Sequence, residues 1–221
     1  MKRDSDGRKR PCAINAREIQ TLWRAVRNDL LKALESFRRT GESNNREKIF
    51  SEMVYCLLTP QSKALYCWAA VGELKKKGLL FKGPAQTVAA ELTKVRFPNN
   101  KSLYILEARS KLPEIMSLLK LENNPLELRK RLIKDIKGYG FKEASHFLRN
   151  IGRGEQLSIL DRHILRNMKN FGVIDDIPDS ISEKNYLEIE KIFMSFAKGL
   201  NIPPAELDLL LWYKETGKVF K

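Results

Sequence analysis

The chain has 221 residues, 43% of them hydrophobic, which is enough to bury a hydrophobic core and excludes a wholly disordered protein. With three Cys and two His, the composition excludes an iron–sulfur cluster and a Cys-rich zinc site, so we expect no metal and no cofactor. The 41 Lys and Arg exceed the 27 Asp and Glu, and the formal net charge of +14 favours a nucleic-acid partner, although a thermophile-like or ribosome-associated surface is the alternative.

Residues 1–14 form a polar, basic and aperiodic segment, for which we expect a mobile arm. From there apolar residues recur with the period of an α-helix through nearly the whole chain, and no strand-like alternation is sustained. We therefore expect an all-α fold, with residues 15–221 forming one unit of two helical lobes. The expected helices cover residues 19–40, 49–58, 62–77, 101–120, 126–137 and 142–151, then one that opens at Asp161, one over 182–198 and one that begins at Pro203-Pro204.

Glycine and proline residues mark the expected ends and bends of these helices. Gly41 is expected to stop the first helix, and Gly78 to cap the third. Pro60 disfavours the helical conformation at the residue before it, so the second helix should end there. Pro113 lies inside the periodic stretch 101–120 and is expected to bend that helix.

A short glycine-containing turn, Ile-Lys-Gly-Tyr-Gly-Phe at 136–141, joins two of the expected helices. This hydrophobic-x-Gly-hydrophobic-Gly pattern indicates a helix-hairpin-helix, here over residues 126–150. Gly138 and Gly140 permit a positive φ and leave no Cβ between the backbone and a phosphate, so the N–H groups of the turn can bind DNA. An ordinary pair of helices with a glycine cap between them is the alternative.

Lys142 stands two residues after the second glycine, in the first turn of the second hairpin helix. The positive end of the helix dipole disfavours an ammonium there and so favours the neutral amine. A neutral lysine amine is suited to Schiff-base chemistry. The alternative is that Lys142 only pairs with a phosphate.

Asp161 follows Lys142 by 19 positions and ends the apolar run 157–160. As the residue before a helix, it is a natural N-cap. A carboxylate at the end of an apolar run is also partly desolvated, and could stabilise cationic charge that develops on a deoxyribose ring. Both interpretations stay open at this point.

The pattern Gly138-x-Gly140-x-Lys142, followed by Asp161, resembles the helix-hairpin-helix, Gly/Pro-rich loop and Asp superfamily of DNA glycosylases. A Lys at this place marks the bifunctional members of that superfamily. The resemblance implies that Lys142 attacks C1′ of a damaged nucleotide, expels the base and nicks the strand by β-elimination. It implies that Asp161 favours the cationic transition state, with the active site in the cleft between the two lobes.

Further segments extend the resemblance over residues 17–221. The run Cys-Leu-Leu-Thr-Pro-Gln-Ser at 56–62 is similar to the superfamily's interhelical loop, which implies that Gln61 enters the gap left by a flipped nucleotide. Residues 96–101 and 209–221 resemble the second class of archaeal and bacterial 8-oxoguanine glycosylases.

This second resemblance implies how the base is recognised. Phe97 and Trp212 match the positions that sandwich the flipped purine, although large aromatic residues of this kind also serve as core residues. Lys221 is implied to read 8-oxoguanine through its free carboxylate, because 8-oxoguanine has an N7–H donor where guanine has only an acceptor.

The expected function is base-excision repair of double-stranded DNA that contains oxidised guanine, carried out by a bifunctional glycosylase. We expect a monomer in the cytoplasm, because the sequence has no signal peptide and no long apolar run for a membrane. Two alternatives remain: a glycosylase and lyase for another damaged base, and a helix-hairpin-helix module that binds DNA without catalysis. The module has no need for a Lys and an Asp at this spacing.

Overall fold

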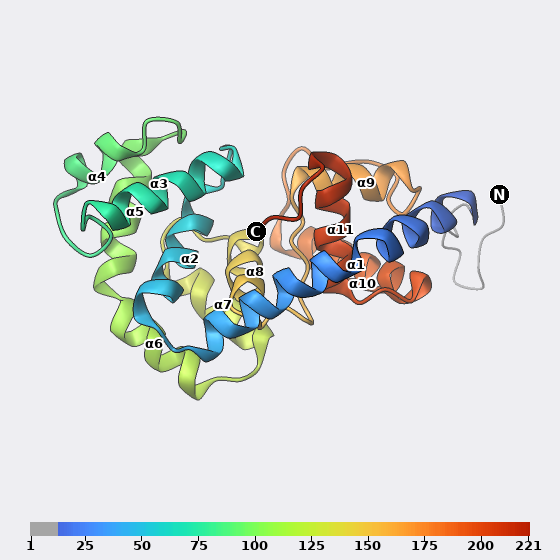
Figure 1. Cartoon of the computed structure of the whole chain (residues 1–221), viewed down its shortest axis with the longest axis horizontal. Coiled ribbons are helices and arrows are strands. Elements are labelled where there is room, and N and C mark those ends of the chain that lie inside the picture. Colours follow the sequence, from blue (N-terminus) through green and yellow to red (C-terminus); the bar gives the residue numbers. More distant parts are fainter. Residues whose placement is uncertain (1–12) are drawn as a thin grey trace. The chain divides into compact units, whose positions relative to one another are not determined.

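The computed structural model describes the backbone of residues 13–221 and the side chains of residues 16–221 (Figure 1). Within that range the chain is helical with no strand, which confirms the all-α prediction. Residues 1–12 of the predicted mobile arm lie outside the described residues. The helices are α1 (Ala13–Glu42), α2 (Arg46–Leu58), α3 (Ala64–Lys76), α4 (Ala85–Glu91), α5 (Pro98–Ser110), α6 (Leu112–Leu121), α7 (Pro125–Asp135), α8 (Phe141–Asn150), α9 (Arg162–Asn170), α10 (Glu183–Leu200) and α11 (Pro204–Thr216).

The helices divide between two compact units. The central unit is Arg38–Arg153, and the terminal unit combines residues 13–37 with Gly154–Lys221. Helix α1 contributes residues to both units, because the division falls after Phe37. Among the described residues, none of the helices is both long and apolar enough to cross a membrane.

The central unit is built around α2, whose residues 49–58 are all buried. This helix packs against α3, α5 and α8, and α8 also packs against α7 (Figure 1). Asn45 caps the start of α2 by accepting a hydrogen bond from the Lys48 amide. The helix ends at Leu58, as expected, but Thr59 keeps helical angles (φ −66°, ψ −31°), so the effect that Pro60 was expected to have on the preceding residue is absent. The buried α2 thus carries the segment 59–62 at its C-terminal end.

In the terminal unit, polar side chains of α1 tie it to the last two helices. The Gln20 amide donates to the carbonyl oxygen of Leu200 at 3.1 Å, and Nε1 of Trp23 donates to Oε2 of Glu206 at 2.7 Å. Helix α11 packs against α10 and against α9. These contacts hold together the helices that position Asp161, at the start of α9, and Trp212, in α11.

Gly41 was expected to stop the first helix, and this expectation is wrong. Helix α1 continues through Gly41 to Glu42, and the chain turns at Asn44, which has φ of 47°. A Cβ added at Gly41 would collide with the carbonyl oxygen of Ile151. The residue is therefore required for a close approach of two backbones and not for helix termination.

The single bent helix expected over 101–120 is also wrong. The structure has two helices there, α5 and α6, separated at Lys111. Pro113 lies at the start of α6, where its missing N–H costs no helical hydrogen bond. The short helix α4 was not expected from the sequence, because seven residues give too few turns to establish a period.

Candidate active site

The helices of the predicted hairpin are α7 and α8, and their turn contains two glycines with different backbones. Gly138 has φ of 90°, and a Cβ built on it would lie 2.6 Å from Cδ2 of Tyr104. Both its conformation and its packing therefore require glycine. Gly140 has φ of −110° and ψ of −169°, which are extended values open to any residue. The backbone thus uses the freedom of glycine at Gly138 and does not use it at Gly140.

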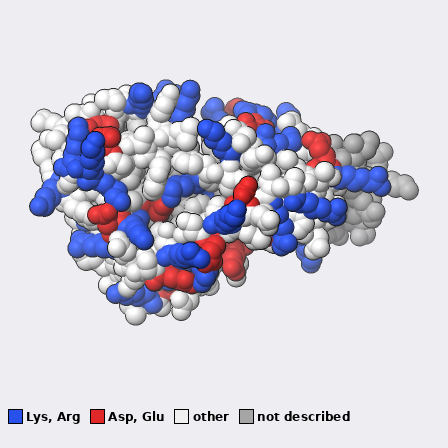
Figure 2. Space-filling view, viewed as in Figure 1, with Lys and Arg blue, Asp and Glu red and all other residues white. Residues whose placement is uncertain are grey.

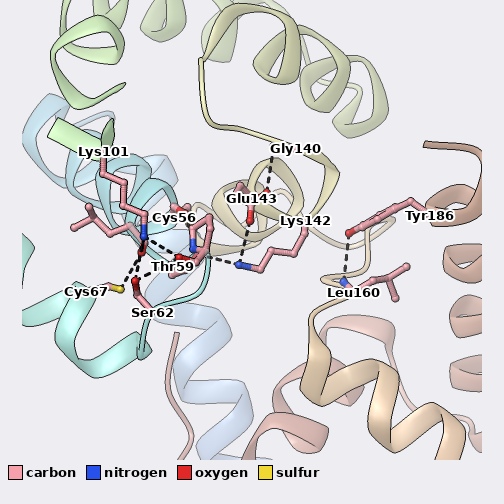
Figure 3. Close-up of polar contacts among 12 residues, drawn as sticks. Cys56, Thr59, Ser62, Cys67, Lys101, Gly140, Lys142, Glu143, Leu160 and Tyr186 are labelled. Atoms are coloured by element: carbon pink, nitrogen blue, oxygen red, sulfur yellow. Dashed lines mark hydrogen bonds and ion pairs between the residues drawn. The ribbon is translucent and has the colours of Figure 1, made fainter. Parts of the chain in front are cut away.

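The N–H of Gly140 already has a hydrogen-bond partner within the chain. It donates to Oε2 of Glu143 at 3.2 Å, so a carboxylate lies at the positive end of the α8 dipole (Figure 3). This N–H is one of the groups expected to bind a DNA phosphate. A phosphate that binds there therefore has to replace the Glu143 carboxylate.

Substituting each of the two glycines by alanine is expected to separate folding from DNA binding. Gly138→Ala should lower the free energy of unfolding by about 1–3 kcal/mol, because it forces a non-glycine residue to a positive φ beside Tyr104. Gly140→Ala should change stability by less than about 1 kcal/mol, since its backbone is extended. Urea denaturation of both variants checks the difference, and equal losses of stability would contradict it. Binding of duplex DNA, measured by fluorescence anisotropy, should weaken in Gly140→Ala for all sequences alike.

Lys142 is the second residue of α8, and two side chains hold its amine (Figure 3). Nζ donates to Oγ1 of Thr59 at 2.9 Å and lies 3.3 Å from Oε1 of Glu143. The Thr59 hydroxyl donates in turn to the carbonyl oxygen of Cys56 at 2.9 Å, so its lone pairs are available to the lysine. The Lys142 side chain is 21% exposed, and the amine is thus both oriented and accessible.

Two thiols near this amine are kept unreactive by burial. Cys56 and Cys67 are both fully buried, and the Cys67 thiol donates to the carbonyl oxygen of Leu58 at 3.2 Å. Burial raises the pKa of the Cys56 thiol well above its usual value and raises the pKa of Cys67 to about 11. Both thiols are protonated at neutral pH and buried, so neither is placed to act as a nucleophile.

Gln61 and Phe97 lie on two turns with left-handed backbones. Their φ values are 55° and 58°, which is uncommon for residues other than glycine and asparagine. Both side chains are exposed, Phe97 by 48%, and the Arg96 guanidinium lies 5.3 Å from the centroid of the Phe97 ring. The exposure excludes a core role for Phe97.

Asp161 is the N-cap of α9, as expected from its place in the sequence. Its Oδ1 accepts hydrogen bonds from the N–H groups of His163 and Ile164 at 2.8 and 2.9 Å, so the cap does not use Oδ2. The preceding residue is fixed too, because the Leu160 N–H donates to the Tyr186 hydroxyl at 3.3 Å (Figure 3). The carboxylate is half-buried on a well-supported backbone.

Trp212 and Lys221 belong to the C-terminal part of the terminal unit. The half-buried Trp212 meets the His163 ring edge-on, with centroids 4.9 Å apart. Nδ1 of His163 lies 3.6 Å from Oε2 of Glu215. Lys221 is half-buried, and its Nζ lies 5.7 Å from the centroid of the Phe37 ring. Trp212 therefore contacts the same helix that Asp161 caps.

The predicted site residues divide between the two units. The central unit contains Gln61, Phe97, Gly138, Gly140 and Lys142, and the terminal unit contains Asp161, Trp212 and Lys221. Among the side chains that the structure describes, no three or more His, Cys, Asp or Glu lie together so as to hold a metal ion. Lys and Arg side chains are spread over the face drawn in Figure 2, with Asp and Glu between them. The excess of Lys and Arg, a formal net charge of +14, suits a phosphate backbone.

The hairpin, the lysine at its second helix and the capping aspartate lie in the part of the chain that a known family model matches. That model is described as 8-oxoguanine DNA glycosylase, and it matches residues 30–202. The chain belongs to the 8-oxoguanine DNA glycosylase family. This membership confirms the resemblance inferred from the hairpin, Lys142 and Asp161.

Relatives within the 8-oxoguanine DNA glycosylase family match nearly the whole chain. An 8-oxoguanine DNA glycosylase/AP lyase of Fusobacterium nucleatum is 43% identical over 209 residues, which covers 92% of this chain and 96% of that protein. The crystal structure of the Thermotoga maritima 8-oxoguanine DNA glycosylase has a TM-score of 0.85 at 35% identity and covers 93% of this chain and 98% of its own. The Methanocaldococcus jannaschii 8-oxoguanine glycosylase/lyase was crystallised with a 15mer DNA containing 8-oxoguanine. Its structure has a TM-score of 0.86 at 32% identity, and the match covers 94% of this chain and 100% of that chain.

In this member of the 8-oxoguanine DNA glycosylase family, sequence reasoning missed three residues around the lysine. Glu143 could have been found, because a Glu three residues after an N-cap is the second half of a capping box. Thr59 gave no signal of its own, since it is 83 positions from the lysine that it binds. Lys101, which is only 4% exposed, gave none either, because lysines are rarely buried.

Proposed function

We propose that this protein removes 8-oxoguanine from double-stranded DNA and then nicks the strand through a Schiff base on Lys142. The observation that carries the proposal is the Lys142 amine, bound to the Thr59 hydroxyl at the start of the second hairpin helix. Membership of the 8-oxoguanine DNA glycosylase family supports the substrate. The glycosylase/AP lyase names of the relatives support the pairing of base removal with strand cleavage.

The proposed reaction begins when Nζ of Lys142 bonds to C1′ of the damaged nucleotide. The bond from C1′ to the base breaks, and the base leaves with its electron pair. Opening of the sugar ring gives an imine between C1′ and the lysine. Loss of a proton from C2′ then expels the 3′ phosphate, and hydrolysis of the imine returns the free amine.

Other residues of the proposed site act before and during this step. The Gly138 and Gly140 turn holds a DNA phosphate, and Gln61 fills the gap left when the damaged nucleotide leaves the helix. Phe97 and Trp212 stack on the flipped purine, and Lys221 contributes to reading the oxidised base. Asp161 stabilises the cationic charge of the sugar in the transition state. We propose that the enzyme acts as a monomer in the cytoplasm.

Borohydride trapping on duplexes with different lesions tests the proposed function. Borohydride reduces the imine to a stable amine, so a covalent protein–DNA product reports Schiff-base formation. We expect trapping on duplexes with 8-oxoguanine or an abasic site, and none on undamaged DNA. Trapping only on duplexes with a different oxidised base would mean that this base, and not 8-oxoguanine, is the substrate. Tight binding with no trapping on any duplex would indicate a DNA-binding module without catalysis.

Thr59→Val is expected to slow the chemistry without weakening DNA binding. Valine has nearly the shape of threonine but offers no hydroxyl to the Lys142 amine, which then loses its fixed orientation. Imine formation on abasic DNA should slow by about tenfold. Single-turnover borohydride trapping measures this rate. The duplex dissociation constant, measured in the same buffer, serves as the control. An unchanged trapping rate would show that Thr59 does not position the lysine.

A further inference from the structure

Lys101 is a buried lysine that the proposed mechanism does not use. It lies in the first turn of α5 and is only 4% exposed. Its Nζ donates to the carbonyl oxygens of Leu58 and Pro60 at 2.7 and 2.8 Å, and to Oγ of Ser62 at 3.1 Å (Figure 3). An ammonium has three N–H donors, and each one has an acceptor here.

These acceptors connect Lys101 to both left-handed turns. Pro60 and Ser62 are the two neighbours of Gln61 in the chain, so the lysine holds the Gln61 turn on both sides. Oγ of Ser62 also accepts a hydrogen bond at 3.0 Å from the N–H of Arg96, the residue before Phe97. The N–H of Lys101 donates to the carbonyl oxygen of Phe97 at 3.0 Å. One side chain and its own backbone thus tie the two turns together.

We infer that Lys101 is a positioning residue that holds the Gln61 turn and the Phe97 turn in a fixed relation, so that gap filling and base stacking occur together. The inference rests on the proposed function, which gives these two side chains their roles. The strain of two left-handed residues supports it, because such backbones persist only where surrounding contacts hold them. Three hydrogen bonds from a buried cation supply such contacts.

Burial lowers the pKa of Lys101 to about 8. The charged and titratable groups that face its ammonium are Cys67 on α3, Lys142 and Glu143 on α8, and Arg96 in the neighbouring turn. Above this pKa the neutral amine keeps only two N–H groups for three acceptors. The contact that joins the turns is therefore weaker in alkaline solution than at neutral pH.

The experiment compares base excision with nicking of a preformed abasic site. Both need Lys142, but an abasic site has no base for Phe97 to stack on. Lys101→Met keeps the apolar stem of the side chain and removes all three hydrogen bonds. We expect the ratio of the 8-oxoguanine excision rate to the abasic nicking rate to fall by about tenfold in single turnover. The exposed Lys94, changed to Met, is the matched control and should keep the wild-type ratio.

The pH profile and a double variant provide two further measurements. Between about pH 7 and about pH 9 the ratio should fall in the wild type and stay flat in Lys101→Met, because only the wild type loses the ammonium. Any ionisation of the substrate is common to both proteins and cancels in this comparison. Adding Phe97→Ala to Lys101→Met should cause little further loss of excision, since residues that act through one another are not additive.

Each outcome decides for or against the inference. If Lys101→Met does not fold, Ser62→Ala removes only the shared acceptor and should still lower the ratio by about threefold. An unchanged ratio in the folded variants, with excision and nicking reduced equally or not at all, overturns the inference. If the wild type neither excises 8-oxoguanine nor nicks abasic DNA, the proposed function fails instead, and the two failures are distinct.

Discussion

Replacing Lys142 with glutamine is expected to abolish strand nicking and borohydride cross-linking while duplex binding persists. Glutamine can still donate a hydrogen bond to Thr59, as the lysine amine does at 2.9 Å, but its amide nitrogen cannot form an imine with C1′. Nicking should fall by about a thousandfold or more, because no other group replaces a covalent nucleophile. Gel analysis of abasic duplexes, with and without borohydride, measures both effects.

Lys120→Gln is the matched control for this experiment. Lys120 is exposed on α6 and carries the same charge, so its loss should leave cross-linking intact. Persistent cross-linking in Lys142→Gln would mean that a different amine is the nucleophile. The buried thiols Cys56 and Cys67 cannot be that group, since a thiol gives no borohydride-trapped imine.

Asp161→Asn is expected to keep the fold and lose most of the base-removal rate. Asparagine caps helices as well as aspartate, and its Oδ1 can accept the same two hydrogen bonds from His163 and Ile164. It has no charge with which to stabilise a cationic sugar, so excision should slow by about 100-fold or more. Single-turnover excision of 8-oxoguanine and thermal unfolding give the two readouts.

Asp161→Ala separates the cap from the charge. Alanine removes both, so excision should slow as much as in Asp161→Asn. The free energy of unfolding should also fall, by about 0.5–2 kcal/mol. Wild-type excision in Asp161→Asn, together with reduced stability in Asp161→Ala, would leave Asp161 with a structural role alone.

The helices of this chain were largely predictable from apolar periodicity, and the errors have local causes. The break between α5 and α6 falls at Ser110-Lys111, which contains neither glycine nor proline. Pro113 was interpreted as a bend because proline at the start of a helix and proline inside one look alike in a sequence. Gly41 was interpreted as a stop, since nothing local indicates that Ile151 approaches it.

The candidate site was predictable where its residues are close in sequence or at a fixed spacing. Lys142 follows the hairpin glycines directly, and Asp161 stands at a recognisable distance from it. Long-range contacts were not predictable, as the binding of Lys142 to Thr59 and of Lys101 to the Gln61 turn shows. A buried lysine with three acceptors is known only once the fold has brought those acceptors together.

The left-handed turns at Gln61 and Phe97 have a consequence for the evolution of this chain. Among the described residues, the other two non-glycine positions with positive φ are Asn44 and Asn201, where the sequence has the residue best suited to such a backbone. Selection for thermodynamic stability alone would favour glycine or asparagine at 61 and 97 as well. The proposed roles of the long amide and the large exposed ring put stability and activity in conflict at these two positions, so a screen for thermostable variants would tend to eliminate both side chains.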